Sequence, residues 1–277
     1  MALFTITKSI FFGMALILLF LSLNNPFAEI QGLAEFNLFM MASAGMLVIL
    51  PSSKQTWYEI KDSKELINSY AVGLIIGVFG WFVINFMVQA TSGVYNLLGT
   101  VSGQMLSAVD STQLAFVAII FPLTETIILV GGTLFLANFL KGRIPFNKVV
   151  AGLAIILLFS GFHFNDRNDG QFEYSISGFV NFIGNVEGIG QPDYVGAFPQ
   201  LLLGAFWVLM ALSFKNWVVA WSAHSVSNLL SLFIIFGPEP FIFILGAVYV
   251  GITLIVLQRG GFKFFNKFDL KGVLKSG

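Results

Sequence analysis

The chain has 277 residues, of which 57% are hydrophobic and 10% charged, and its mean hydropathy is +0.87. Soluble domains average about 45–50% apolar and about 25% charged residues, so this composition excludes an ordinary soluble globular protein. The 14 basic and 14 acidic side chains cancel, which leaves no basic surface for nucleic acid, and the absence of cysteine excludes disulfides, thiolate zinc sites and cysteine nucleophiles.

Eight apolar runs predict an all-α polytopic membrane protein with about eight transmembrane helices, because about 20 apolar residues cross the hydrocarbon core. The first, second and fifth runs are short, and they predict helices that recruit flanking residues or cross only half of the bilayer. No small-residue cleavage site follows Pro26, so the first run is interpreted as an uncleaved helix. In chain order the runs cover residues 8–23, 33–50, 70–90, 114–140, 146–164, 197–214, 216–236 and 240–258.

The basic residues predict the orientation. With the amino terminus in the cytoplasm, only Arg167 falls on the outer side, and the positive-inside rule then places both termini in the cytoplasm. We expect a single integral membrane domain over residues 1–277, with an acidic external loop at 165–196 and a basic cytoplasmic tail at 259–277. The absence of an N-x-[ST] sequon agrees with a prokaryotic plasma membrane. The basic residues on the inner side are Lys8, Lys54, Lys61, Lys64, Lys141, Arg143, Lys148, Lys215, Arg259, Lys263, Lys267, Lys271 and Lys275.

Three ionisable side chains lie inside the predicted spans. Glu125 is the only carboxylate there, and His163 and His224 are the only histidines in the chain. An ionised group at the centre of a membrane helix costs about 2.5–3.5 kcal/mol on insertion scales, so such groups usually face a cavity and serve a function. The alternative interpretation is structural: a protonated, hydrogen-bonded glutamate and two histidines that bridge neighbouring helices.

The spacing of the polar residues indicates how they are presented. His224 and Asn228 are four residues apart, so they share one helix face and could hold a single oxygen together. Phe159 and His163 have the same spacing, which predicts that the phenyl ring forms a wall of the pocket beside the imidazole.

Proline and glycine predict local features of the backbone. Pro122 predicts that the fourth helix starts or kinks just before Glu125. Gly73 and Gly77 form a small-xxx-small pair, which predicts close packing of the third helix against a neighbour.

Three segments carry a family resemblance: FPLTETIILVGG from Phe121, FSGFH from Phe159 and HSVSN from His224. They resemble the CAAX protease and bacteriocin-processing (CPBP) family of multi-spanning intramembrane proteins, whose motifs are EExxxR, FxxxH and HxxxN. The resemblance covers roughly residues 121–228, inside a family-like core at about 114–236. It implies an intramembrane endopeptidase of the type II CAAX kind, whose substrate is a membrane-embedded or membrane-associated protein or peptide.

The resemblance also implies residue roles. Glu125 matches the first glutamate and, aided by His163, would deprotonate the water that attacks the scissile carbonyl. His224 and Asn228 match the third motif and would hold the oxyanion. Phe159 matches the phenylalanine of the second motif and supports the site. The implied chemistry uses no cofactor, and a zinc ion held by the glutamate and both histidines is the second choice.

The first motif departs from the family at two positions. Thr126 stands in place of the second glutamate, where we count it as a supporting residue, and Val130 stands in place of the arginine. These departures keep open a catalytically silent CPBP-like immunity or scaffold protein. A transporter is a further alternative, in which Asn85 and Gln89 of the third span would line a path, although a hydrogen-bonded interhelical pair is the simpler interpretation of these two residues.

Overall fold

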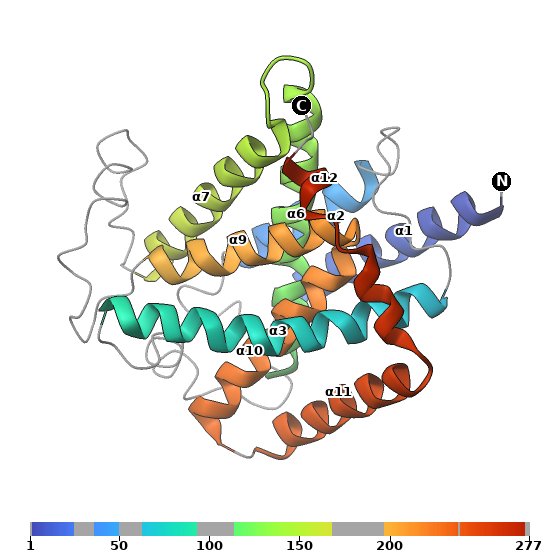
Figure 1. The fold of residues 1–277 in the computed structure, drawn as a ribbon, viewed down its shortest axis with the longest axis vertical. Coiled ribbons are helices and arrows are strands. Elements are labelled where there is room, and N and C mark those ends of the chain that lie inside the picture. Colours follow the sequence, from blue (N-terminus) through green and yellow to red (C-terminus); the bar gives the residue numbers. More distant parts are fainter. Residues whose placement is uncertain are drawn as a thin grey trace.

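The structure is a computed structural model that describes residues 2–24, 36–49, 63–92, 114–167, 197–237 and 239–274. Every element in these ranges is helical, as the composition predicts (Figure 1). The elements in chain order are α1 (Ala2–Leu23), α2 (Phe36–Ile49), α3 (Ser63–Ser92), η1 (Phe116–Ile120), α6 (Phe121–Leu140), α7 (Asn147–Arg167), α9 (Ala197–Phe214), α10 (Trp217–Phe236), α11 (Pro240–Gln258), η2 (Gly261–Lys267) and α12 (Leu270–Leu274).

Each predicted apolar run contains one long helix, but the helix ends differ from the ends of the runs. α3 begins at Ser63, seven residues before its run, because Lys64 and Glu65 are good helix formers outside the apolar segment. α7 continues to Arg167, three residues beyond its run. Within the described ranges, four segments are long and apolar enough to cross a membrane: Lys64–Met87, Phe116–Leu140, Trp217–Ile234 and Pro240–Gln258.

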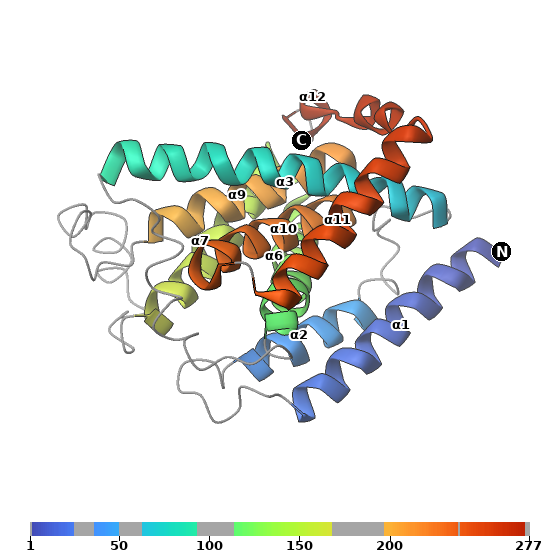
Figure 2. The same ribbon diagram turned by 90° about the horizontal axis from the view of Figure 1, so that it is seen from below.

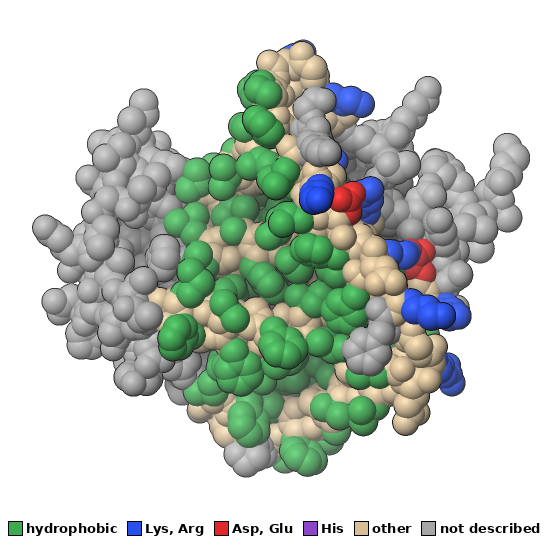
Figure 3. Space-filling view, in the orientation of Figure 1, with side chains coloured by type: hydrophobic (Ala, Val, Ile, Leu, Met, Phe, Trp, Pro, Cys, Tyr) green, Lys and Arg blue, Asp and Glu red, His purple; other side chains and the backbone are tan. Residues whose placement is uncertain are grey.

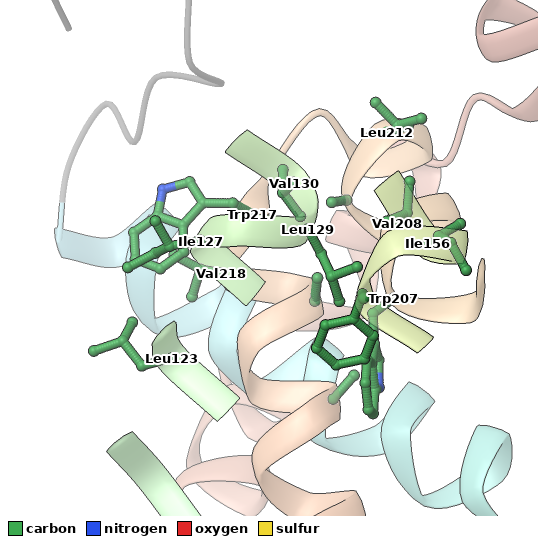
Figure 4. Packing of buried hydrophobic residues seen from close by; sticks show 14 of the residues in the cluster. Leu123, Ile127, Leu129, Val130, Ile156, Trp207, Val208, Leu212, Trp217 and Val218 are labelled. Atoms are coloured by element: carbon green, nitrogen blue, oxygen red, sulfur yellow. The ribbon is translucent and has the colours of Figure 1, made fainter. Parts of the chain in front are cut away.

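α6 and α10 form the centre of the helix assembly. Figure 2 shows them between α3 on one side and α1 and α2 on the other. The largest buried cluster joins α6 to its neighbours, and Figure 4 shows Leu129 and Val130 of α6 in that cluster with Trp207 and Val208 of α9 and Ile156 of α7. Glu125 and Thr126 on α6 and His224 and Asn228 on α10 therefore lie on the most enclosed helices, whereas His163 lies on α7.

The outer helices expose apolar side chains. α11 carries Phe243, Ile244 and Leu254 on its surface at 67%, 62% and 53% exposure. Water-soluble proteins seldom expose a large continuous apolar surface, whereas lipid tails solvate one. Figure 3 shows such a surface over one face of the molecule, with the Lys and Arg side chains gathered along one border. These features are those of a helical membrane protein.

α3 and α10 cross in close contact, as Gly73 and Gly77 predict. A Cβ atom on Gly73 would overlap the Ser222 hydroxyl, and one on Gly77 would overlap the Ala223 backbone. The prediction of small-residue packing is confirmed, because only glycine lets these two backbones approach so closely.

Hydrogen bonds extend this contact at both ends. The Asn216 side-chain amide donates to Ser69 Oγ at 2.7 Å, and Trp81 Nε1 donates to Ser231 Oγ at 3.1 Å. These contacts occur in the same order along both helices, so α3 and α10 run in the same direction.

The carboxyl-terminal segment ties the helix ends together at the charged border. Lys267 of η2 pairs with Glu65 near the start of α3. Asp269 lies 3.8 Å from Lys215 Nζ, and its backbone N–H donates to Ser213 O at the end of α9. The basic segment after residue 259 is thus packed against the ends of α3 and α9.

Candidate functional site

The backbone before Glu125 departs from α-helical geometry. η1 is a π-helical turn, in which the N–H of Phe121 donates to Phe116 O, five residues earlier. Pro122 is the second residue of α6, and the helical path runs through it without a break from the π turn, so the predicted irregularity just before Glu125 lies inside the helix rather than at its start. A π turn adds one residue to the helical path and rotates the residues that follow by roughly 100°. This turn therefore sets the side of α6 on which Glu125 is presented.

α10 brings the second polar group to the same place. The helix begins at its N-cap Asn216, whose Oδ1 accepts a hydrogen bond from the N–H of Val218 at 2.9 Å. The glycine-mediated crossing with α3 fixes its position on the opposite side. His224 is two turns into α10, 2% exposed, and faces α6.

Glu125 and His224 form a buried pair. Glu125 Oε2 lies 3.2 Å from His224 Nε2, and the side chains are 12% and 2% exposed. The structure thus joins two of the four residues predicted to be catalytic. In a site this poor in water, a hydrogen bond between a carboxylate and an imidazole is stronger than at a surface, and each group reduces the cost of burying the other.

Two further side chains contact the imidazole. Thr126 Oγ1 lies 3.4 Å from His224 Nδ1, so the threonine that follows Glu125 is part of the site. The indole of Trp207 stacks on the imidazole, with 3.4 Å between ring centroids and 18° between ring planes. Both ring nitrogens and a ring face of His224 are therefore in contact, which restricts its rotation.

The contact with Thr126 couples the protonation of Glu125 to the tautomer of His224. When Glu125 is ionised, His224 Nε2–H donates to the carboxylate, and Nδ1 accepts from the Thr126 hydroxyl. When Glu125 is protonated, the same contacts work with every donor and acceptor exchanged. The two states differ by one proton on the carboxyl group, and in each the imidazole takes the matching tautomer without moving a heavy atom.

Asn228 is one turn beyond His224, as its spacing predicts, but its amide bonds to the backbone. Asn228 Nδ2 donates to Val117 O in the π turn at 3.0 Å. Nearby, Trp221 Nε1 donates to Ile119 O at 3.3 Å. The amide expected to meet a substrate oxygen thus meets a carbonyl of the protein.

The second motif lies on α7. Phe159 is 3% exposed and belongs to the same buried cluster as Trp207. The backbone of His163 lies in the last part of α7, and its side chain lies outside the described residues.

A zinc site formed by Glu125, His163 and His224 is the alternative interpretation of these residues. Among the side chains that the structure describes, no three His, Cys, Asp or Glu residues come close enough to hold a metal ion.

Sequence reasoning missed two parts of the site. Trp207 gives no signal, because an aromatic residue in an apolar run is ordinary. The backbone carbonyl of Val117 is invisible in any side-chain pattern, although Pro122 is a signal for it, since a proline in a helix leaves a carbonyl without a donor.

No known protein family matches this chain, and no curated protein or solved structure matches it.

Proposed function

We propose that the protein is an intramembrane endopeptidase that uses a glutamate-activated water. The observation that carries the proposal is the Glu125–His224 pair, buried among apolar helices at 3.2 Å. Membrane segments rarely contain such groups without a function. The resemblance of the Glu125, Phe159–His163 and His224–Asn228 segments to the CPBP motifs supports the same reaction.

In the proposed reaction, the Glu125 carboxylate takes a proton from water while the water oxygen bonds to the scissile carbonyl carbon. The imidazole keeps its Nε2–H during this step. Because protonated Glu125 is a weaker acceptor, that N–H becomes available to the oxyanion that forms. The carbon–nitrogen bond then breaks as the proton passes from Glu125 to the leaving amine, which restores the carboxylate. His163 is proposed to assist the carboxylate, as the resemblance implies.

A cleavage assay tests this proposal. The purified protein is placed in liposomes with a set of membrane-inserted peptides that carry a fluorophore and a quencher, and cleavage sites are read by mass spectrometry. We expect Glu125→Gln to reduce turnover by at least about 10²-fold, the usual contribution of a general base.

The matched control is Glu239→Gln, since Glu239 is an exposed glutamate at the start of α11. Its turnover should equal that of the wild type. Full turnover in Glu125→Gln would exclude the assignment of this residue as the base.

The second candidate is a catalytically silent CPBP-like immunity or scaffold protein. It is favoured by one observation: the amide of Asn228 donates to the backbone carbonyl of Val117, as it would in a structural role. In that case the wild-type protein cleaves none of the peptides, while Glu125→Gln still changes thermal stability.

A transporter receives less support. The Asn85 amide donates to Trp81 O in its own helix at 2.8 Å, rather than to a neighbouring helix. The side chain of Gln89 lies outside the described residues.

We also propose that all eight long helices cross a prokaryotic plasma membrane, with both termini in the cytoplasm. The parallel course of α3 and α10, the third and seventh of the eight, is the relation that this topology requires. The short connection from Lys141 to Phe146 makes α6 and α7 antiparallel neighbours. The position of Lys215 near Lys148 and Asp269 also supports it, because residues from three inner segments meet there.

A further inference from the structure

The carbonyl of Val117 has lost both backbone donors that could reach it. In α-helical geometry its donor would be the N–H of Phe121, but that group donates to Phe116 O. In π-helical geometry its donor would be the N–H of residue 122, which is proline and has none. A partly buried carbonyl without a donor is costly, which favours a hydrogen bond from a side chain.

α10 supplies it from the face that carries His224. Asn228 Nδ2 donates to Val117 O, and Trp221 Nε1 donates to Ile119 O. Residues 221, 224 and 228 are at positions i, i+3 and i+7, so they form one stripe along the helix. The same stripe that pairs with Glu125 therefore also holds the π turn that precedes it.

The π turn determines the direction of Glu125. Without the extra residue, α6 would be rotated by roughly 100° relative to η1, and the carboxylate would turn away from α10. The bonds from Asn228 and Trp221 are made only while the turn is π-helical and faces α10. They thus link the rotation of α6 to the position of His224.

We propose that Asn228 is a positioning residue: its amide replaces the backbone donor that Pro122 removes, and so stabilises the π turn that aims Glu125 at His224. The HxxxN spacing then serves two different partners, the carboxylate and a backbone carbonyl. The catalytic consequence rests on the proposed endopeptidase function, whereas the link between Asn228 and Pro122 holds independently of it.

A double-mutant cycle tests the link. The full-length protein is compared with Asn228→Ala, Pro122→Ala and the double variant, by thermal unfolding in detergent. Alanine at 122 restores an N–H that can serve Val117 O, directly or by converting the turn to α-helix. We therefore expect Asn228→Ala to lower the unfolding midpoint in the wild-type background and to have no effect when residue 122 is alanine.

Activity provides the second measurement. Asn228→Ala should lower kcat by about tenfold or more, the equivalent of a lost buried hydrogen bond, with KM unchanged. In the Pro122→Ala background, Asn228→Ala should cause no further loss of kcat. In that background the Val117 carbonyl already has a backbone donor, or η1 has already become α-helical.

Two outcomes would overturn the proposal. One is an equal loss of stability on Asn228→Ala in both backgrounds. The other is an Asn228→Ala variant whose unfolding midpoint is unchanged and whose loss of kcat multiplies with the loss caused by Pro122→Ala. That result is expected for an amide that donates to a substrate oxyanion. A wild type that cleaves nothing contradicts the proposed function alone, since the unfolding cycle still measures the coupling.

Discussion

Thr126 directly follows Glu125 and contacts the other member of the pair, His224. Its side chain is fully buried, and its hydroxyl lies 3.4 Å from His224 Nδ1. A hydroxyl can donate to a neutral imidazole or accept from it, which a carboxylate cannot do without changing its protonation. Thr126 therefore gives His224 a neutral partner that can accommodate either tautomer of the imidazole.

This role predicts the effect of Thr126→Val, which keeps the shape of the side chain and removes the hydroxyl. We expect kcat to fall about fivefold, since one neutral hydrogen bond contributes about 1 kcal/mol. Thr126→Ser is the matched variant and should retain most of the activity. Equal kcat values for the valine variant and the wild type would show that the hydroxyl has no part in the reaction.

At the scale of residues, the sequence indicated the site wherever an ionisable side chain falls in an apolar helix. Glu125 and His224 were predictable because ionisable groups are expensive in apolar helices. Trp207 was not predictable, since its contact depends on how α9 packs. The partner of Asn228 was missed because its spacing indicates the helix face it occupies and not the backbone group opposite.

At the scale of elements, the crossing of α3 and α10 positions one side of the site. Ser222 and Ala223, which contact Gly73 and Gly77, directly precede His224 in the chain. A shift at the crossing would therefore move the imidazole. Glycine here offsets its unfavourable helix propensity by allowing contact between two backbones.

We expect Gly77→Ala to destabilise the protein by about 1–3 kcal/mol, the usual cost of adding bulk to a packed interface. The control is Gly251→Ala in α11, where a Cβ atom meets nothing within 4 Å. Because alanine is the better helix former, this control should keep or raise the unfolding midpoint. The intrinsic tryptophan fluorescence of both variants during heating gives the comparison. An equal effect of the two substitutions would contradict a close crossing at Gly77.

The helices themselves were predictable from apolar runs, and their ends were less so. A run ends where composition changes, whereas a helix ends where its hydrogen bonds end. Lys64 and Glu65 are polar and still helical, which explains the early start of α3. The π turn at Phe116–Ile120 was not predictable, because it arises from Pro122 together with the donors that α10 presents.

At the scale of the whole molecule, the absence of cysteine offers a clean test of topology. Single cysteines are placed at Arg143, between α6 and α7, and at Asp169, in the acidic loop predicted from the sequence, and are labelled with a membrane-impermeant maleimide in intact cells. Eight spans predict labelling at 169 from outside the cell and labelling at 143 only after the membrane is opened.

A topology in which only the four longest segments cross the membrane gives a different result. α7 would then not cross, and both cysteines would lie on the same side. Matching accessibility of the two positions would therefore contradict eight spans, and the basic border would need another explanation.

The distance along the chain between the two halves of the site affects how the protein is made. Thr126 and His224 are 98 residues apart in sequence. At about 5–20 residues per second, the ribosome needs about 5–20 s to add that length, and α6 is complete for most of this interval. The nascent chain must keep Glu125 protonated or close to water until α10 emerges, because its partner imidazole does not yet exist. Synthesis that stops in this interval leaves an acid without its partner, a species that membrane quality control can distinguish from the finished protein.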